Sequence, residues 1–447
     1  MSTETQPAYK TIGKLTGWAA LGVVLLFYIL SYLDRTLLSL MVEPIQASLK
    51  ISDTQIGLLQ GASFALFYAF VGLPVGWAVD RYSRRWIIFI GVVVWSISTA
   101  CCGLARSFLS LGLARAGVGA GEATLAPAAF SLMPEWFPRK RLAAAIGVYY
   151  MGSNLGASLA LFIGGVTIAS IDKSKGLTLP GVGLLETWQT VFIVLGAPGV
   201  LLAFLVFLVR ERIGSRVAGV EVAQAATWGE FFQFFRRRRA VVICHLVGFP
   251  LLALAILALG AWSPAYMGRQ FGWEPAQIGP VLAASGLLGM VFNVGLGIAA
   301  DTLFTRGVHD SYYRVQIWAT LASLPFTILA FTTTGPYAFA TYLAISMGFL
   351  SFGGPSVAAL QLIAPVRMRG RLSAIYLLLI ALIGTNLGPL IPGLLNDHVF
   401  HDRAQLGHSL LIVVCSVSVV AVAFLTFGLK HLRAALTDKD AAIGAEA

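Results

Sequence analysis

The chain has 447 residues, of which 57% are hydrophobic and 11% are charged. About one quarter of the residues in a soluble domain are charged, so this composition excludes an ordinary soluble protein and predicts an integral membrane protein. The formal net charge of +11 could indicate nucleic-acid binding. The basic residues are instead distributed by side of a membrane, so no nucleic-acid partner is expected.

Apolar stretches of helical length recur along the whole chain and predict an all-α protein with twelve transmembrane helices. Each stretch is long enough to cross a hydrocarbon layer of about 30 Å, which takes about 20 residues as a helix. The first apolar run continues directly into charged residues, so no cleavable signal peptide is expected. The expected helices cover residues 18–41, 54–79, 86–105, 108–133, 142–169, 188–209, 241–267, 275–300, 312–333, 336–363, 371–396 and 407–431.

The positions of the Lys and Arg residues predict which ends of these helices face the cytoplasm. With the N-terminus inside, most of the 31 basic residues lie in inner segments, and the positive-inside rule then places both termini in the cytoplasm. Short tails and compact loops favour a prokaryotic cytoplasmic membrane. The outer loops hold only Lys50, Arg106, Lys173, Lys175, Arg269 and Arg403, and Arg35 and Arg115 lie within helices.

Two stretches of the chain are repeated about half its length apart, as in transporters built from duplicated helix bundles. The stretch "TQIGLLQGASFALFYAFVGLPVGWAVDR" (54–81) aligns with "AQIGPVLAASGLLGMVFNVGLGIAADT" (276–302), and "GSNLG" (152–156) aligns with "GTNLG" (384–388). The repeat predicts an N-terminal six-helix bundle (1–209), a cytoplasmic linker (210–240) and a C-terminal bundle with its tail (241–447).

The linker ends in "WGEFFQFFRRRR" (228–239), where aromatic residues precede four arginines. One interpretation is an interfacial amphipathic helix that binds anionic lipid head groups. The other, which the sequence favours, is a topology anchor that holds this loop in the cytoplasm.

Four ionisable residues are embedded in the expected helices of the N-terminal half. An ionisable side chain at membrane depth costs at least about 2.5 to 3.5 kcal/mol, so it is expected to face a partner or a wet cavity. A polar stripe at helical spacing surrounds one of them and should face water or substrate. The four are Asp34, Arg35, Arg115 and Glu122, and the stripe around Arg35 consists of Tyr28, Ser31, Tyr32 and Ser39.

Helical geometry predicts how the four charges are arranged. Asp34 and Arg115 both lie toward the outer half of their helices, which favours a pair between them. Arg115 and Glu122 share one helix face, with Glu122 about 10 Å deeper and free to titrate. A proton relay through Glu122 and Asp34 is the favoured hypothesis, because a moving arginine would change the proton affinity of a buried carboxylate. The alternative is a fixed ion network that only sets helix register.

Several motifs resemble those of a known transporter superfamily. The stretch "GWAVDRYSRR" (76–85) resembles the loop between the second and third helices of the major facilitator superfamily, with Ser83 in place of the usual glycine. "RAGVGAGEA" (115–123) resembles its fourth-helix motif. "YLDRTLLS", "GAGEATLAPAAFSL" and "FPRKRLAAAIGVYYMGSNLG" together resemble the spinster family of lysophospholipid and sphingosine-phosphate transporters.

The resemblance implies two bundles that give alternating access to a central cavity lined by the first and fourth helices. It also implies a cytoplasmic gate, in which Asp80 caps the eleventh helix near Arg371, Arg81 reaches Glu135, and Asp301 makes the related contact in the second half. The expected gating residues are Gly76, Asp80, Arg81, Arg84, Arg85, Glu135, Asp301 and Arg371.

The predicted cavity is charged in the N-terminal half and apolar in the C-terminal half, which suits an amphiphilic anion. Arg35 is expected to hold the head group with Arg115 as a helper, and Glu122, Tyr28, Tyr32 and Ser31 complete the substrate site. The expected function is secondary transport of a lysophospholipid or a sphingoid phosphate, with the proton as coupling ion and no cofactor. Carriage of another organic anion, such as a sugar acid, and multidrug efflux are the alternatives. A monomer is expected, with membrane lipid as its surroundings.

Other function classes find little support in the sequence. No nucleophile with a base and no GxxxxGK[ST] loop appears, so neither an enzyme nor an ATP-driven pump is expected. A channel would not require duplicated halves. The four cysteines imply no disulfide framework, and His398, His401 and His408 are expected to be solvated rather than metal-bound. His245 is expected to be a hydrogen-bonded packing residue, and Asn154 and Asn386 are expected to form bonds between helices.

Overall fold

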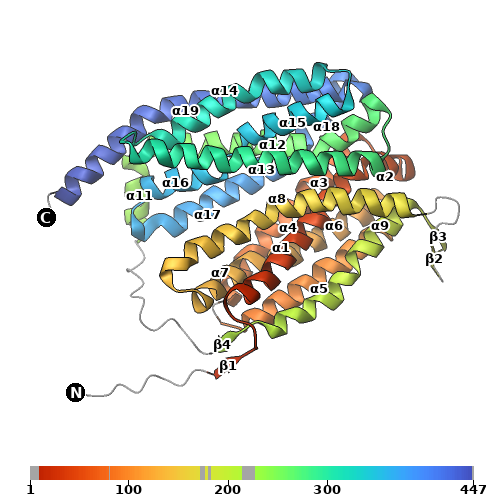
Figure 1. Cartoon of the computed structure of the whole chain (residues 1–447), viewed down its shortest axis with the longest axis horizontal. Helices are drawn as coiled ribbons and strands as arrows, with labels where there is room; N and C mark the ends of the chain where they lie inside the picture. Colours follow the sequence, from red (N-terminus) through yellow and green to blue (C-terminus); the bar gives the residue numbers. More distant parts are fainter. Residues whose placement is uncertain (1–9, 80, 172–176, 180–182, 214–226, 445–447) are drawn as a thin grey trace. The chain divides into compact units, whose positions relative to one another are not determined.

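The structure is a computed structural model that describes residues 10–79, 81–171, 177–179, 183–213 and 227–444. Helices make up nearly all of the described chain (Figure 1), which confirms the predicted all-α fold. Two short antiparallel strand pairs accompany them. They join β1 (Lys10–Ile12) to β4 (Glu211–Ile213) and β2 (Leu177–Leu179) to β3 (Gly183–Leu185).

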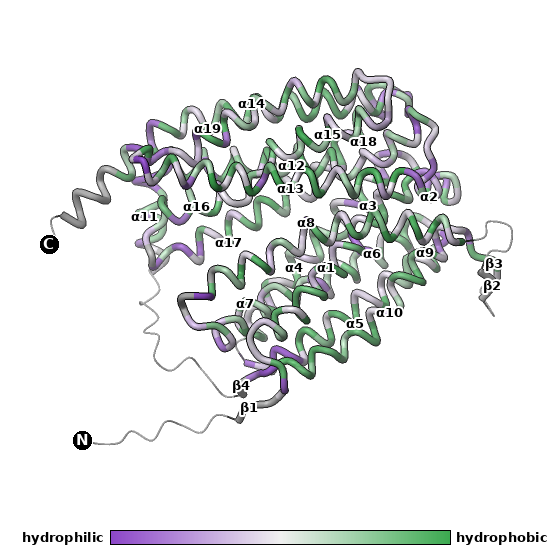
Figure 2. The backbone as a smooth tube through the Cα atoms, viewed as in Figure 1, coloured by the Kyte–Doolittle hydropathy of each residue, from purple (hydrophilic) through white to green (hydrophobic). Residues whose placement is uncertain are grey.

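The helices follow the expected order, and several are divided into shorter segments. Hydrophobic residues run along them, and hydrophilic residues gather at their ends and turns (Figure 2). In the first half of the chain the helical segments are α1 (Gly17–Leu40), α2 (Val42–Leu49), α3 (Asp53–Gln60), α4 (Ala62–Val79), α5 (Arg84–Cys102), α6 (Phe108–Glu122), α7 (Leu125–Trp136), α8 (Arg139–Ser170), α9 (Thr187–Gly196), α10 (Pro198–Leu202) and η1 (Ala203–Leu208).

In the second half of the chain the segments include a π-helical stretch, η3, within the eleventh expected helix. The segments are α11 (Trp228–Arg237), α12 (Arg239–Phe271), α13 (Pro275–Thr305), α14 (Ser311–Thr332), α15 (Pro336–Leu350), α16 (Gly353–Ile363), η2 (Val366–Met368), α17 (Arg369–Leu379), η3 (Ile380–Leu387), α18 (Gly388–Leu395), η4 (Asn396–Phe400), η5 (Arg403–Gln405) and α19 (Leu406–Gly444).

Within the described residues, eleven of the twelve expected helices are long and apolar enough to cross a membrane by length and composition. The fourth expected helix is not among them, and it is divided into α6 and α7 at Ala123 and Thr124. The tenth is divided in the same way into α15 and α16 at Ser351 and Phe352. Each break is followed within four residues by a proline, Pro127 or Pro355, which has no N–H to continue the hydrogen-bond ladder.

The chain forms two compact units whose boundaries differ from those of the repeat. Unit 1 contains Met1–Arg35, Leu66–Ala160 and Ile171–Val222, and unit 2 contains Thr36–Ala65, Leu161–Ser170 and Ala223–Ala447. Residues 36–65 and 161–170 therefore belong to one compact unit with the C-terminal half. The division at 209 and 240 describes the repeat and stays a prediction.

Glycines allow close helix packing at repeat-related positions of both units. In unit 1, a Cβ on Gly156 would lie 3.0 Å from the carbonyl oxygen of Ile29 in α1. In unit 2, a Cβ on Gly388 would lie 3.0 Å from the carbonyl oxygen of Leu254 in α12. The glycines of the "GSNLG" and "GTNLG" stretches thus pack the fifth expected helix on the first and the eleventh on the seventh.

The asparagines of the same two stretches do not form the expected bonds between helices. Asn154 is exposed, and the buried Oδ1 of Asn386 accepts no hydrogen bond within the described residues. That expectation was wrong, because backbone contact at the neighbouring glycines holds these helices together.

The repeated Gln-Ile-Gly motif has a structural cause in both copies. The side chain of Gln55 accepts from the backbone N–H of Ser52, and that of Gln277 accepts from the backbone N–H of Glu274. Each glutamine therefore completes a capping box at a helix start. Two residues later, Gly57 packs against the backbone of Pro389, and Gly279 packs against that of Leu161 and Gly165.

We predict that Gly57→Ala lowers the stability of unit 2. Its Cβ would lie 2.7 Å from the carbonyl oxygen of Pro389, and overpacking of this kind costs about 1 to 3 kcal/mol. Thermal unfolding in detergent should show a lower midpoint than that of the wild type. The matched control is Gly72→Ala in α4, where an added Cβ meets no atom within 4 Å. Equal midpoints for the two variants would show that close approach at Gly57 does not matter.

Candidate functional site

An ion pair between Arg35 and Glu122 lies at the centre of the candidate site. Arg35 is in α1, and its Nε donates to Oε2 of Glu122 at 2.6 Å while its Nη2 pairs with the same oxygen. The Glu122 side chain is 1% exposed and that of Arg35 is 25% exposed. The arginine of the first helix thus neutralises Glu122 in an environment that disfavours an unpaired charge. That Glu122 takes up and releases a proton stays a prediction.

The position of Glu122 at the end of α6 adds to its need for a partner. It is the last residue of that helix, where the dipole is negative and a carboxylate is disfavoured. Arg35 offsets both the charge of the Glu122 carboxylate and the negative end of the α6 dipole. The second carboxylate oxygen, Oε1, is buried and accepts no hydrogen bond within the described residues, so this carboxyl group has an open position for a proton.

Aromatic rings surround the guanidinium of Arg35. Its Cζ lies 5.1 Å from the ring centre of Tyr32 and 5.3 Å from that of Tyr68. Tyr28 contacts Tyr32 edge to face and stacks on Tyr149 with ring centres 4.4 Å apart. These rings attract a cation through their faces and leave an apolar lining beside it.

Sequence reasoning found Tyr28 and Tyr32 but missed Tyr68 of α4 and Tyr149 of α8. A second aromatic layer was also missed, formed by Phe130 and Tyr150, whose ring centres are 5.7 Å apart. The adjacent tyrosines in "GVYYMG" were the available signal, but their direction depends on how α8 packs against α1.

Asp34 and Arg115 lie beside this pair in the interior of unit 1. Both are almost fully buried, and Nη1 of Arg115 donates to the backbone carbonyl of Asp34 at 3.3 Å. Electrostatic interactions also connect their charges with each other and with those of Arg35 and Glu122. The structure thus brings together all four predicted ionisable residues, and Arg115 holds the α1 backbone at the position next to Arg35.

The polar stripe of α1 is only partly accessible. Tyr28, Tyr32 and Arg35 are half-buried, whereas Ser31 and Ser39 are buried. The hydroxyl of Ser31 donates to the Tyr28 carbonyl at 3.1 Å, and that of Ser39 donates to the Thr36 carbonyl at 2.7 Å. The expectation that these two serines face water or substrate was wrong, because each satisfies its hydroxyl within its own helix.

A separate ion cluster in unit 1 contains several of the predicted gating residues. Arg84 pairs with Glu135 through Nη1 at 2.8 Å and with Glu211 through Nε at 2.9 Å. Ser83 donates to Glu211 at 2.6 Å, so the serine that replaces the usual glycine has a bonding role. Sequence reasoning missed Glu211, which is buried and caps the start of α5 through the Arg84 backbone N–H.

The other predicted gating residues lie outside this ion cluster. Arg81 lies over the Trp77 ring and donates to the Trp77 carbonyl, so it does not reach Glu135. Asp301 accepts from the hydroxyl of Tyr312 at 2.9 Å. Asp80 lies outside the described residues. The remaining residues are the exposed Gly76, the buried Arg85, which donates to the Phe207 carbonyl, and the half-buried Arg371.

Unit 2 contains a buried polar network that sequence reasoning did not find. Asp53, fully buried at the start of α3, accepts from both Nη atoms of Arg269 at 2.8 Å and from Gln46 and Asn396. Arg269 also pairs with Glu43. This network, the Asp53–Arg269 lock, joins residues 43–53 of the N-terminal half to α12 and η4 of the C-terminal half.

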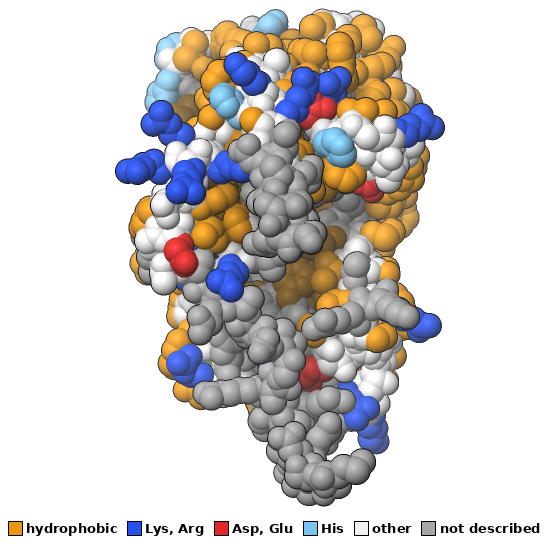
Figure 3. All heavy atoms as spheres, turned by 90° about the vertical axis from the view of Figure 1, so that its left-hand side faces the viewer, with side chains coloured by type: hydrophobic (Ala, Val, Ile, Leu, Met, Phe, Trp, Pro, Cys, Tyr) orange, Lys and Arg blue, Asp and Glu red, His pale blue; other side chains and the backbone are white. Residues whose placement is uncertain are grey.

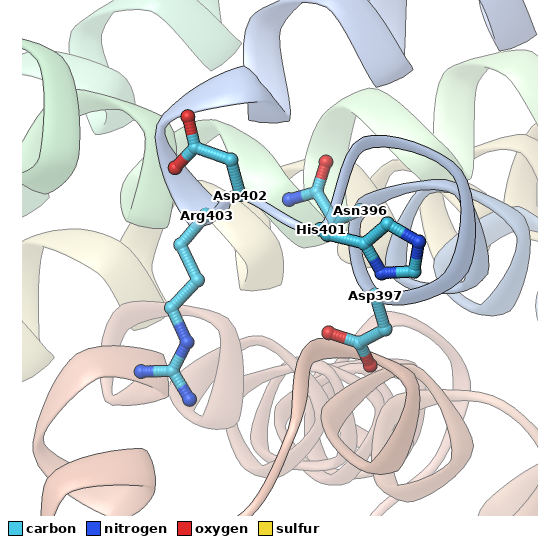
Figure 4. A pocket seen from close by; sticks show the side chains of 5 residues that line it. All are labelled: Asn396, Asp397, His401, Asp402 and Arg403. Carbon is cyan, nitrogen blue, oxygen red and sulfur yellow. The ribbon is translucent and has the colours of Figure 1, made fainter.

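A surface pocket adjoins the lock and is lined by Asn396, Asp397, His401, Asp402 and Arg403 (Figure 4). Asp397 accepts from the backbone N–H of Thr54 at 2.7 Å and so caps α3, while Arg403 donates to the carbonyl of Ile51. Asp397 and Arg403 thus hold the start of α3. Among the residues that the structure describes, no group of His, Cys, Asp and Glu could hold a metal ion.

His245 in α12 is buried in an aromatic cluster of the C-terminal half. Its Nδ1 lies 3.2 Å from the hydroxyl of Tyr313, and its ring packs against Phe249 and Tyr376. It is a hydrogen-bonded packing residue, as predicted.

Comparison with known proteins identifies relatives of this chain. The family model described as Major Facilitator Superfamily matches residues 24–389. An MFS-type efflux pump of Mycolicibacterium smegmatis is 30% identical over 91% of both chains. A hexuronate transporter of Bacillus subtilis is 27% identical over 73% of this chain and 75% of its own.

A solved structure is also similar to the chain. It is that of a bacterial homolog of the human lysosomal transporter spinster, in an inward-facing and unoccupied conformation. The two share 26% identity with a TM-score of 0.75, over 94% of this chain and 98% of the other. The predicted resemblance to the spinster family is confirmed.

Proposed function

Because the chain belongs to the Major Facilitator Superfamily and is an integral, multi-pass membrane transporter, we propose that it carries an anionic amphiphile together with protons. The substrate class is a lysophospholipid or a sphingoid phosphate, and both termini face the cytoplasm. The observation that carries the proposal is the Arg35–Glu122 ion pair ringed by tyrosines.

The ion pair supports a direct link between the anion and the proton. Arg35 is the more exposed partner, so an incoming phosphate competes with Glu122 for the guanidinium. Once Arg35 turns to the phosphate, Glu122 would be an uncompensated buried charge and binds a proton instead. Anion and proton then bind with positive coupling, and the coupling is reciprocal.

The aromatic surroundings support an amphiphile over a small polar acid. The half-buried rings of Tyr28, Tyr32 and Tyr68 offer apolar surface beside the cation, and the buried Tyr149 stacks on Tyr28. Sugar-acid transport remains the second candidate, because a hexuronate transporter is among the relatives and its carboxylate would use Arg35 equally well. A thermal-shift screen of lysophospholipids, sphingoid phosphates, sugar acids and cationic drugs separates these classes, since a ligand raises apparent stability.

The Asp53–Arg269 lock supports alternating access. It connects segments from the two halves of the repeat on the side opposite the termini, by the predicted topology. Its contacts must break when that side opens, so the lock stabilises the state in which the side is closed.

We predict that Glu122→Gln abolishes the response of transport to a pH gradient while substrate still binds. Glutamine keeps the size and hydrogen bonding of glutamate but cannot be protonated. Uptake of a lysophospholipid into proteoliposomes should become independent of the imposed gradient. Glu135→Gln is the matched control, because Glu135 pairs with Arg84 in a different cluster and its loss should leave the pH response intact. A wild-type pH response in Glu122→Gln would refute the assignment.

We predict that Arg35→Lys weakens binding of phosphate-bearing amphiphiles about tenfold, because a charged hydrogen bond contributes about 1.5 to 3 kcal/mol and lysine lacks the planar paired donors of arginine. The measurement compares lysophosphatidate with a neutral monoacylglycerol of the same chain length in a thermal-shift titration. Binding of the neutral lipid should change little. An equal loss for both lipids would mean that Arg35 acts only as the structural partner of Glu122.

We predict that Asp53→Asn speeds amide hydrogen exchange in α3 on the order of 100-fold, because removing one partner of a buried ion pair costs about 3 kcal/mol or more. Exchange is followed by mass spectrometry on peptides that cover residues 51–60. Asp301→Asn is the control, since that exposed aspartate only accepts from Tyr312. The lock does not hold α3 if amide exchange in α3 stays at the wild-type rate in Asp53→Asn, or if it rises as much in Asp301→Asn.

A further inference from the structure

Helix α11 leads directly into a membrane-spanning helix. It covers Trp228–Arg237, and α12 begins at Arg239. Its start is fixed by a capping box in which Thr227 accepts from the backbone N–H of Glu230 at 3.2 Å and Glu230 accepts from that of Thr227 at 2.6 Å. Because a residue next to a span cannot be far from the head-group layer, α11 lies at the membrane surface.

The two faces of α11 differ in exposure. Phe231 is buried, and Phe234 and Phe235 are half-buried, so these rings face the rest of unit 2. The opposite face carries Phe232, which is 66% exposed, with Arg236 one helical turn later. Gln233 and Arg237 are exposed on the same side. An exposed phenylalanine beside two arginines is unfavourable in water but matches the boundary between acyl chains and phosphates.

The charges along α11 are separated by sign. Within the described residues, the side chains of Arg236 and Arg237 make no hydrogen bond or ion pair, and Arg239 is exposed beside them. The acidic residue, Glu230, is at the other end, and the hydrogen bond from the Thr227 backbone N–H lowers its pKa below the usual value. Figure 3, in which the left-hand side of Figure 1 faces the viewer, shows several Lys and Arg side chains and few acidic ones.

We propose that the outer face of α11 is a binding surface for anionic phospholipid head groups. Arg236 and Arg237 donate to lipid phosphates, and Phe232 inserts at the level of the upper acyl chains. A topology anchor needs only positive charge in the loop, in any arrangement. The alignment of Phe232, Arg236 and Arg237 on one face, with Phe231, Phe234 and Phe235 on the other, favours lipid contact over an anchor alone. This inference does not depend on the transported substrate.

The test measures stabilisation of the full-length protein in neutral detergent micelles by added phosphatidylglycerol, with phosphatidylcholine as the neutral reference. The double variant R236Q/R237Q should need about 30-fold more phosphatidylglycerol for half-maximal stabilisation, because each arginine near an anionic surface contributes about 1 kcal/mol, or fivefold. The wild-type effect should weaken with added salt. R236K/R237K keeps the charge and should retain most of the stabilisation.

The matched control for lost charge is R306Q/K430Q, which removes two exposed basic residues of unit 2, one directly after α13 and one within α19. It should respond to phosphatidylglycerol as the wild type does. Each shift is measured from that variant's own midpoint in phosphatidylcholine, so a change in basal stability does not affect the comparison. The proposal is overturned if R236Q/R237Q responds like the wild type, if the control loses as much, or if the lysine variant behaves like the glutamine variant.

Discussion

The need to neutralise charge in an apolar interior determines how unit 1 is built. Glu122 is buried at the end of a helix, where both desolvation and the helix dipole oppose its charge. Arg35 compensates for both, and Arg115 fixes the α1 backbone next to it through the Asp34 carbonyl. The tyrosines of α1, α4 and α8 then complete the shell around the guanidinium. Arg35 is the more exposed partner of the pair, and the proposed competition with a substrate anion rests on this difference.

The two halves share their packing devices but not their chemistry. The glutamine caps, the close-packed glycines and the proline-associated helix breaks occur in both. At the break, however, Glu122 of the first half corresponds to the buried Leu350 of the second, each being the last residue before the interruption. The repeat therefore preserves packing contacts and varies the residue that stands at the break.

Ionic contact is likewise uneven across the helix seams of unit 2. The start of α3 is held by glycine packing against α18 and by the Asp53–Arg269 lock to α12, while the seam between α13 and α8 rests on Gly165, Gly279 and Pro280. A buried ion pair contributes little net stability but is costly to break on one side only. Such a pair favours a seam that is either fully closed or fully open, which suits a carrier that exposes its site to one side at a time.

The sequence by itself determined the class of the protein and the residues of its central site. Hydropathy gave the helices, because lipid permits no other backbone arrangement for runs of this length. The cost of embedded charge singled out Asp34, Arg35, Arg115 and Glu122, and the repeat located the packing glycines. What only the tertiary structure decided is which charges pair. Arg35 pairs with Glu122, Ser31 is buried, and Asp53 meets Arg269 across 216 residues. Helical spacing fixes the face of one helix, but a partner on another helix depends on packing distances and rotations that no local pattern encodes.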